Sequence, residues 1–170
     1  MKDSNRVKDI AQIGVVAALY VALTLALYPL SYGSPQFRLS ESLVLLTYFN
    51  KKHGIGVTLG VFIANFFNPE FALIDCIFGT LSTAIAVVLI CLLKNFFLAS
   101  LMPVLTSIIV VLELYFVLEL PFLLTLIEVM GSMFIIESII GYTVFRLLAK
   151  NKNFLKVIKN ERKEFMNDEV

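Results

Sequence analysis

Apolar and polar residues alternate in long blocks along this chain, and the apolar runs have the length of helices. A helix needs about 20 apolar residues to cross a bilayer, and fewer where neighbouring helices shield part of it. The pattern therefore predicts an all-α integral membrane protein with about six transmembrane helices in one bundle. The expected spans are residues 9–30, 37–50, 54–67, 71–93, 97–118 and 122–149.

Spans two and three are the shortest of the six. They could instead form a broken or re-entrant pair, which a bilayer tolerates only where protein surrounds it. His53 falls in the short connection between them and is expected to be solvated. Residues 1–149 are predicted to form one transmembrane domain, and residues 150–170 a polar cytoplasmic tail.

Composition supports a membrane protein. Hydrophobic residues make up 59% of the chain and charged residues 16%, whereas a soluble domain is about half apolar and a quarter charged. The mean hydropathy of +0.88 also indicates a membrane protein. This apolar excess has to face lipid, so we expect a multi-pass protein of the cell membrane.

The basic residues predict the orientation of the bundle. Cytoplasmic segments of membrane proteins carry an excess of Lys and Arg. If the N-terminus is cytoplasmic, every basic residue except Arg38 falls on the cytoplasmic side, and the opposite segments 30–36, 68–71 and 118–121 carry none. Both termini are therefore predicted to be cytoplasmic, which requires an even number of spans.

Ionisable and amide side chains are costly in lipid, so their positions within spans point to function. Six of them lie in the outer halves of the predicted spans: Arg38, Glu41, Asn65, Asp75, Glu113 and Glu128. The inner halves are almost entirely Leu, Ile, Val and Phe. The distribution predicts one polar pocket that opens to the outside and is closed below by an apolar plug, as in a site that captures a small polar solute.

Four of these residues also have simpler interpretations. Arg38 and Glu41 are three positions apart on one helical face and could pair with each other at the interface. Asn65 and Asp75 could cap the helices beside the turn at Asn68. Both interpretations stay open beside a ligand role.

The other carboxylates differ in how readily they are explained. Glu113 has no basic residue near its depth, which favours a functional role. Glu128 is close enough to the surface to be hydrated. Glu137 lies near the middle of the membrane without an evident partner, and is expected to be neutral and hydrogen-bonded within the bundle.

Small residues recur every four positions on the first span, and these residues are Gly14, Ala18, Ala22 and Ala26. Such a stripe lets another helix approach closely, so it predicts a docking face. Packing within the bundle would explain the same spacing.

The sequence lacks the motifs that usually accompany nucleotide hydrolysis, metal binding and nucleophilic catalysis. It contains no GxxxxGK[ST] phosphate loop, no metal-ligand cluster and no nucleophile-elbow motif. We therefore expect no enzyme activity, no metal or cofactor and no nucleic-acid partner. The internal repeat of many secondary transporters is also missing. If the chain moves a solute, its energy is expected to come from other subunits.

Three strings in succession resemble the queuosine-precursor transporter family, QueT. They are QFRLSESLVLL at residues 36–46, GVTLGVFIANFFNP at 56–69 and LIDCIFGTLST at 73–83. The resemblance covers most of residues 10–145. It implies a substrate-binding S component of an energy-coupling factor (ECF) transporter, which works with a transmembrane scaffold (T) subunit and two cytoplasmic ATPase subunits. The small-residue stripe matches the face with which such components dock on the scaffold.

The resemblance also implies a ligand, a 7-deazaguanine precursor of queuosine in its aminomethyl form. The donor edge of such a ring suits a carboxylate, its carbonyl suits Arg or Asn, and an aminomethyl cation suits a second carboxylate. Glu113 and Asp75 are the expected acceptors, with Arg38, Glu41 and Asn65 completing or bracing the site. Aromatic residues at the outer rim, such as Phe37, Phe66 or Tyr115, are candidates for stacking on the ring.

The sequence departs from the family pattern at two places. Relatives tend to carry Asn early in the fifth span and a Gly-Glu pair in the sixth, where this chain has residues 105–107 (Leu-Thr-Ser) and 131–133 (Gly-Ser-Met). These departures imply a variant ligand, or substitution by Glu128 or Glu137. The sequence is also compatible with an S component for another vitamin-like or purine-like metabolite, with a secondary carrier, and with a membrane protein without transport activity.

Overall fold

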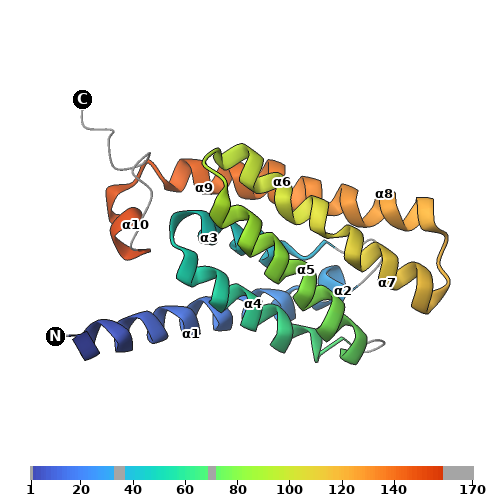
Figure 1. Ribbon diagram of the computed structural model, residues 1–170, viewed down its shortest axis with the longest axis horizontal. Coiled ribbons are helices and arrows are strands. Elements are labelled where there is room, and N and C mark those ends of the chain that lie inside the picture. The colour runs from blue at the N-terminus through green and yellow to red at the C-terminus, as the bar shows by residue number, and fades with distance from the viewer. Residues whose placement is uncertain (1, 33–36, 69–71, 159–170) are drawn as a thin grey trace.

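A computed structural model describes residues 2–32, 37–68 and 72–158 of the chain, and every element within these ranges is helical (Figure 1). The elements are α1 (Lys2–Ala26), α2 (Tyr28–Tyr32), η1 (Leu39–Leu45), α3 (Leu46–Phe49), α4 (Lys51–Asn65), α5 (Ala72–Leu92), α6 (Phe96–Thr106), α7 (Ile108–Leu118), α8 (Phe122–Met133), η2 (Phe134–Gly141), α9 (Tyr142–Leu148) and α10 (Lys152–Val157). The predicted all-α class is confirmed.

Four helical stretches are long and apolar enough to cross a membrane. They are Arg6–Ala26, Leu73–Leu92, Phe96–Leu118 and Phe122–Leu148, and they correspond to predicted spans one, four, five and six. The second and third predicted spans are shorter helices, formed by η1 with α3 and by α4. η1 is a 3₁₀-helix, in which the rise per residue is larger than in an α-helix.

The third segment begins earlier than predicted. The side chain of Asn50 caps α4 by accepting a 3.1 Å hydrogen bond from the backbone N–H of Lys52. His53 therefore lies within the first turn of α4 and is only 2% exposed. The prediction that His53 is solvated is wrong.

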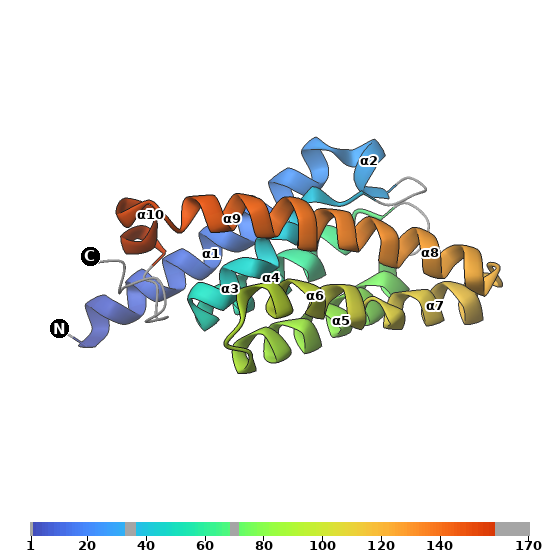
Figure 2. The ribbon, with the colours of Figure 1, turned by 90° about the horizontal axis from the view of Figure 1, so that it is seen from above.

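The successive long segments run back and forth along the bundle, and α10 lies at the same end as the first turns of α1 in both views (Figures 1 and 2). Two contacts join this end. Gln12 Nε2 donates a 2.8 Å hydrogen bond to the carbonyl of Val157, and Lys52 Nζ lies 2.6 Å from Asp9 Oδ2. We call it the basic end, because the α3–α4 and α5–α6 connections carry their lysines there.

An aromatic cluster fills the interior of the basic end. Tyr48, Phe49, Phe96, Phe145 and Phe154 pack with ring centroids 4.9–6.4 Å apart. The apolar plug below the pocket stays a prediction, and this cluster is the candidate for it. Because Phe154 belongs to α10, the first residues of the predicted polar tail pack onto the bundle; the rest of the tail, 159–170, lies outside the described residues.

α1 and α4 approach each other closely, and the glycines that permit this contact are on α4. A Cβ atom added to Gly56 would lie 2.7 Å from the carbonyl oxygen of Ile13, and one added to Gly60 would lie 2.7 Å from Cβ of Tyr20. The predicted stripe on α1 faces away from this contact, because Gly14, Ala18, Ala22 and Ala26 are not among its buried residues. The stripe is therefore not used for packing among the described residues.

The outward faces of the long helices are apolar. Leu73, Leu92, Phe116 and Leu123 are each more than 70% exposed. Large apolar side chains with this exposure are expected where a helix meets lipid rather than water.

Candidate functional site

A polar cavity lies in the half of the bundle away from the basic end. α4 runs away from that end and finishes at Asn65, while α5 returns toward it with Asp75 in its first turn. Eight polar residues line the cavity, and they are Arg38, Glu41, Asn65, Asp75, Ser82, Thr83, Thr106 and Ser132. The cavity volume is about 50 Å³, room for a few water molecules, so a ring-shaped ligand requires side chains to move apart.

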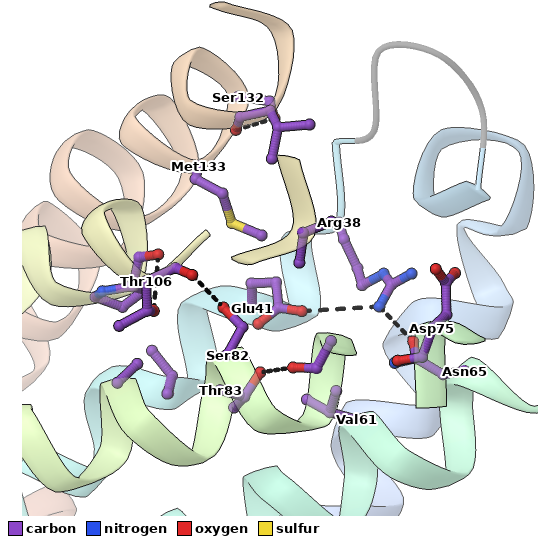
Figure 3. A pocket seen from close by; sticks show the side chains of 16 residues that line it. Arg38, Glu41, Val61, Asn65, Asp75, Ser82, Thr83, Thr106, Ser132 and Met133 are labelled. Carbon is purple, nitrogen blue, oxygen red and sulfur yellow. Dashed lines mark hydrogen bonds and ion pairs between the residues drawn. The ribbon is translucent and has the colours of Figure 1, made fainter. Parts of the chain in front are cut away.

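Arg38 is the central cation of this cavity. Its Nη1 donates a 2.7 Å hydrogen bond to Asn65 Oδ1 and lies 3.8 Å from Glu41 Oε1 (Figure 3). The guanidinium carbon also lies 5.1 Å from the ring centroid of Tyr32, within the range of a cation–π contact. The predicted Arg38–Glu41 pair exists, and the same two side chains line the cavity.

Two side chains of α1 brace the acidic side of the cavity. The hydroxyl of Tyr20 donates a hydrogen bond to Glu41 Oε1, and Thr24 Oγ1 lies 2.6 Å from Ser40 Oγ. Tyr20 and Thr24 are fully buried. The sequence contained no specific signal for either role, since both residues occur in an otherwise apolar span.

Asn65 and Asp75 join the ends of α4 and α5. Asn65 Nδ2 donates a 2.8 Å hydrogen bond to the backbone carbonyl of Asp75, and Asn68 Nδ2 donates to Asp75 Oδ2. A Cβ atom added to Gly79 would lie 2.8 Å from Asn65 Nδ2, so glycine permits this approach. The described side-chain hydrogen bonds of Asn65 go to Arg38 and to the carbonyl of Asp75, and neither is a contact with the N–H groups of a helix N-terminus. The prediction that Asn65 caps a helix is wrong for its side-chain hydrogen bonds, because they join α4 to Arg38 and to α5 instead.

Glu113 does not line the cavity. Its carboxyl group interacts with that of Asp75, which does. Glu113 is 3% exposed, and its Oε2 atom has no hydrogen-bond partner among the described residues. The structure thus brings Arg38, Glu41, Asn65 and Asp75 together around the cavity, with Glu113 outside its lining.

The remaining predicted residues lie elsewhere. Glu128 is half-buried on α8 and does not line the cavity. Phe66 and Tyr115 are exposed, Phe37 is half-buried, and none of these rings lines the cavity. A stacking role for them would need a rearrangement of the rim.

Both places where the sequence departs from the family pattern contribute to the cavity. Thr106 and Ser132 line it, and each hydroxyl donates to a carbonyl of its own helix, Pro103 at 3.2 Å and Val129 at 2.9 Å. The hydroxyl oxygens keep lone pairs that can accept hydrogen bonds. Ser82, which sequence reasoning missed, donates a 2.8 Å hydrogen bond to the carbonyl of Thr106.

Metal chemistry finds no support in the described ranges. No group of three or more His, Cys, Asp or Glu side chains lies close enough there to hold an ion. The polar groups that meet in the cavity instead offer a guanidinium, carboxylates, an amide and hydroxyls, which suits an organic ligand with several donors and acceptors.

Fold and site together define a helical membrane protein with a buried polar pocket between its helices. The family model described as QueT transporter matches residues 10–150. A protein from Lactococcus lactis subsp. cremoris (strain MG1363), described as queuosine precursor transporter QueT, is 42% identical over 138 residues, which cover 71% of this chain and 80% of that protein. The chain belongs to the QueT transporter family. No solved structure gives a significant match to it.

Proposed function

We propose that this chain is the substrate-capture S component of an ECF transporter, and that it binds a queuosine precursor, the aminomethyl 7-deazaguanine, from outside the cell. The observation that carries the proposal is the polar cavity built by the family strings. Arg38 and Glu41 come from the first string, Asn65 from the second and Asp75 from the third. The similarity to the Lactococcus protein, whose name specifies a queuosine precursor, supports the same ligand.

The chemistry of the cavity fits the groups of that ligand. The Asp75 carboxyl group in the lining can accept a hydrogen bond from the donor edge of the ring, and the Glu113 carboxyl group can accept a second one once side chains move apart around the ligand. Arg38 and Asn65 offer donors for the ring carbonyl, and Glu41 offers a carboxylate for the aminomethyl cation. The ligand would displace the contacts that Arg38 and Asn65 make with each other, which exchanges one set of charge-assisted hydrogen bonds for another.

The proposal includes six crossings of the cell membrane, with both termini in the cytoplasm. The back-and-forth course of the segments supports it (Figures 1 and 2), as does the position of the lysines at the basic end. In this orientation the cavity lies in the outer half of the bundle and the aromatic cluster in the inner half. A solute can then enter from outside and is blocked below.

The partners follow from the S-component role. A transmembrane scaffold subunit and two cytoplasmic ATPase subunits would supply the energy, since this sequence contains no phosphate loop. The stripe on α1, formed by Gly14, Ala18, Ala22 and Ala26, is the proposed docking face for the scaffold.

A second candidate is an S component for another purine-like or vitamin-like metabolite. The presence of Thr106 and Ser132 in the cavity lining favours it, because these are positions where the sequence departs from the family pattern. Hydroxyl groups in place of an amide and a carboxylate would suit a ligand with fewer charged groups.

Uptake into proteoliposomes tests the role. The chain would be reconstituted with the scaffold and ATPase subunits of its own cell, and accumulation of the aminomethyl compound would be followed with and without ATP. ATP-dependent accumulation is expected. Accumulation without the ATPase subunits would instead identify a secondary carrier.

A further inference from the structure

Glu137 is a buried carboxyl group that the proposed ligand site does not use. It is 0% exposed, and neither of its two carboxyl oxygens has a hydrogen-bond partner among the described residues. A lone buried carboxylate costs several kcal/mol in a low-dielectric interior. An acidic side chain in this position therefore needs either a proton or a cation.

The local helix geometry brings Glu137 to the edge of the ligand site. Glu137 lies on η2, a π-helical stretch in the middle of the sixth span, and such stretches frequently mark functional positions. One turn further along, a Cβ atom added to Gly141 would lie 3.2 Å from Cβ of Ser42. This close contact brings η2 against η1, the element that carries Glu41, and the two carboxyl groups are near enough to interact electrostatically.

Glu41 has an ion-pair partner and a hydrogen-bond partner, whereas the carboxyl oxygens of Glu137 have no hydrogen-bond partner among the described residues. Arg38 and Tyr20 both contact Oε1 of Glu41. The single Arg38 cation therefore already faces one carboxylate. Two ionised carboxyl groups side by side would repel each other, so a proton on one of them is the favourable state.

The elements packed against η2 provide no other counter-charge to Glu137. α6 carries no ionisable side chain, and α8 carries only Glu128, which is half-buried. On α9, Arg146 Nη1 donates a 2.7 Å hydrogen bond to the hydroxyl of Tyr142, at an exposed position. Of the ionisable groups on these elements, Glu41 of η1 is the one that faces Glu137.

We propose that Glu137 holds a proton next to Glu41 while the site is empty, and that a cationic ligand bound at Glu41 displaces this proton to solvent. The O–H bond of the Glu137 carboxyl group breaks, its electron pair stays on the carboxylate, and the proton is released to solvent. The ligand cation then balances the new negative charge. The site thereby prefers a cationic over a neutral ligand, an inference that rests on the proposed function.

Infrared spectroscopy of the purified full-length protein, without any ligand, tests whether Glu137 holds a proton in the empty site. The C=O stretch of a protonated carboxyl group lies apart from the carboxylate bands. At neutral pH one component of this band should be lost in Glu137→Gln, persist in Glu128→Gln and reappear shifted in Glu137→Asp. An unchanged protonated-acid band in folded Glu137→Gln would overturn the proposal.

Calorimetry in two buffers of different protonation enthalpy tests whether ligand binding releases this proton. Binding of the aminomethyl 7-deazaguanine should release about one proton per ligand in the wild type and in Glu128→Gln, and almost none in Glu137→Gln. Equal proton release in the wild type and in Glu137→Gln would overturn the release step. Failure of this compound to bind would overturn the proposed ligand and the release step, while the infrared band would still decide whether Glu137 holds a proton.

Discussion

Arg38 Nη1 donates a 2.7 Å hydrogen bond to Oδ1 of Asn65, and this bond joins the segment before η1 to the last residue of α4. Both side chains are buried. The amide of Asn65 also donates to the backbone of Asp75 at the start of α5. One amide side chain thus holds three segments around the cavity, and it orients the guanidinium group toward the space where a ligand would bind.

Replacement of Asn65 by Ala should therefore weaken both the fold and the site. The variant loses the acceptor for Arg38 and the donor to Asp75, and an unsatisfied buried polar group costs about 1–3 kcal/mol. We expect a lower thermal unfolding temperature in detergent and a ligand affinity at least about tenfold lower. Thr58→Val is the matched control, because the Thr58 hydroxyl donates to Gly54 of its own helix and Thr58 does not line the cavity. Equal behaviour of the two variants would contradict a bracing role for Asn65.

Glu113→Gln should abolish ligand binding while the fold remains intact. The substitution replaces a carboxyl group, whose oxygens can accept from the donor edge of the ring, by an amide that presents an N–H group to that edge. Calorimetric titration measures the binding, and thermal unfolding checks the fold. Glu128→Gln is the control: neither carboxyl group lines the cavity, but Glu113 interacts with the lining residue Asp75. Unchanged affinity in Glu113→Gln would remove Glu113 from the site.

Gly60→Val should destabilise the contact between α1 and α4. Even a Cβ atom at this position lies 2.7 Å from Tyr20 Cβ and 3.1 Å from the carbonyl oxygen of Ala17. Overpacking of this kind typically costs about 1–3 kcal/mol. Gly14→Ala has no atom within 4 Å of the new Cβ, and should leave the unfolding temperature unchanged or raise it slightly because Ala is the better helix former. The reverse order of the two effects would contradict the α1–α4 packing.

Ala18→Leu and Ala22→Leu should spare ligand binding and block transport. Both positions lie on the α1 face that is turned away from α4, and a larger side chain there would keep a scaffold helix at a distance. Uptake into cells and copurification with the ATPase subunits measure the effect. Val88→Leu, at an exposed position on α5, is the control for a larger lipid-facing side chain. Normal assembly and uptake in both stripe variants would show that the stripe faces lipid and does not dock on the scaffold.

The course of the chain was predictable because hydrophobic length and turn residues act locally. Spans one, four, five and six appear as predicted. The short second and third segments were harder, because a helix shielded by its neighbours, such as the largely buried η1 and α3, does not need a full apolar span. The small-residue spacing also could not show which helix face is inward. Gly56 and Gly60 have the same four-residue spacing as the stripe, yet it is they that permit the close α1–α4 contact.

The polar residues of the site were predictable as a group, because charges in apolar spans are conspicuous. Their partners were not. Tyr20 contacts Glu41, and Glu137 faces it, through packing of segments that are distant in the sequence. The π-helical stretch that carries Glu137 has no marker such as Pro in the sequence, and it packs against η1 and α6.

Calorimetric binding of the aminomethyl 7-deazaguanine to the purified, detergent-solubilised protein tests the central claim most directly. Guanine and the nitrile precursor would be titrated alongside it. We predict saturable binding of the aminomethyl compound, with weaker binding of the nitrile and of guanine, which lack the cation. Absence of binding to all three, from a folded and monodisperse sample, would contradict the proposed substrate.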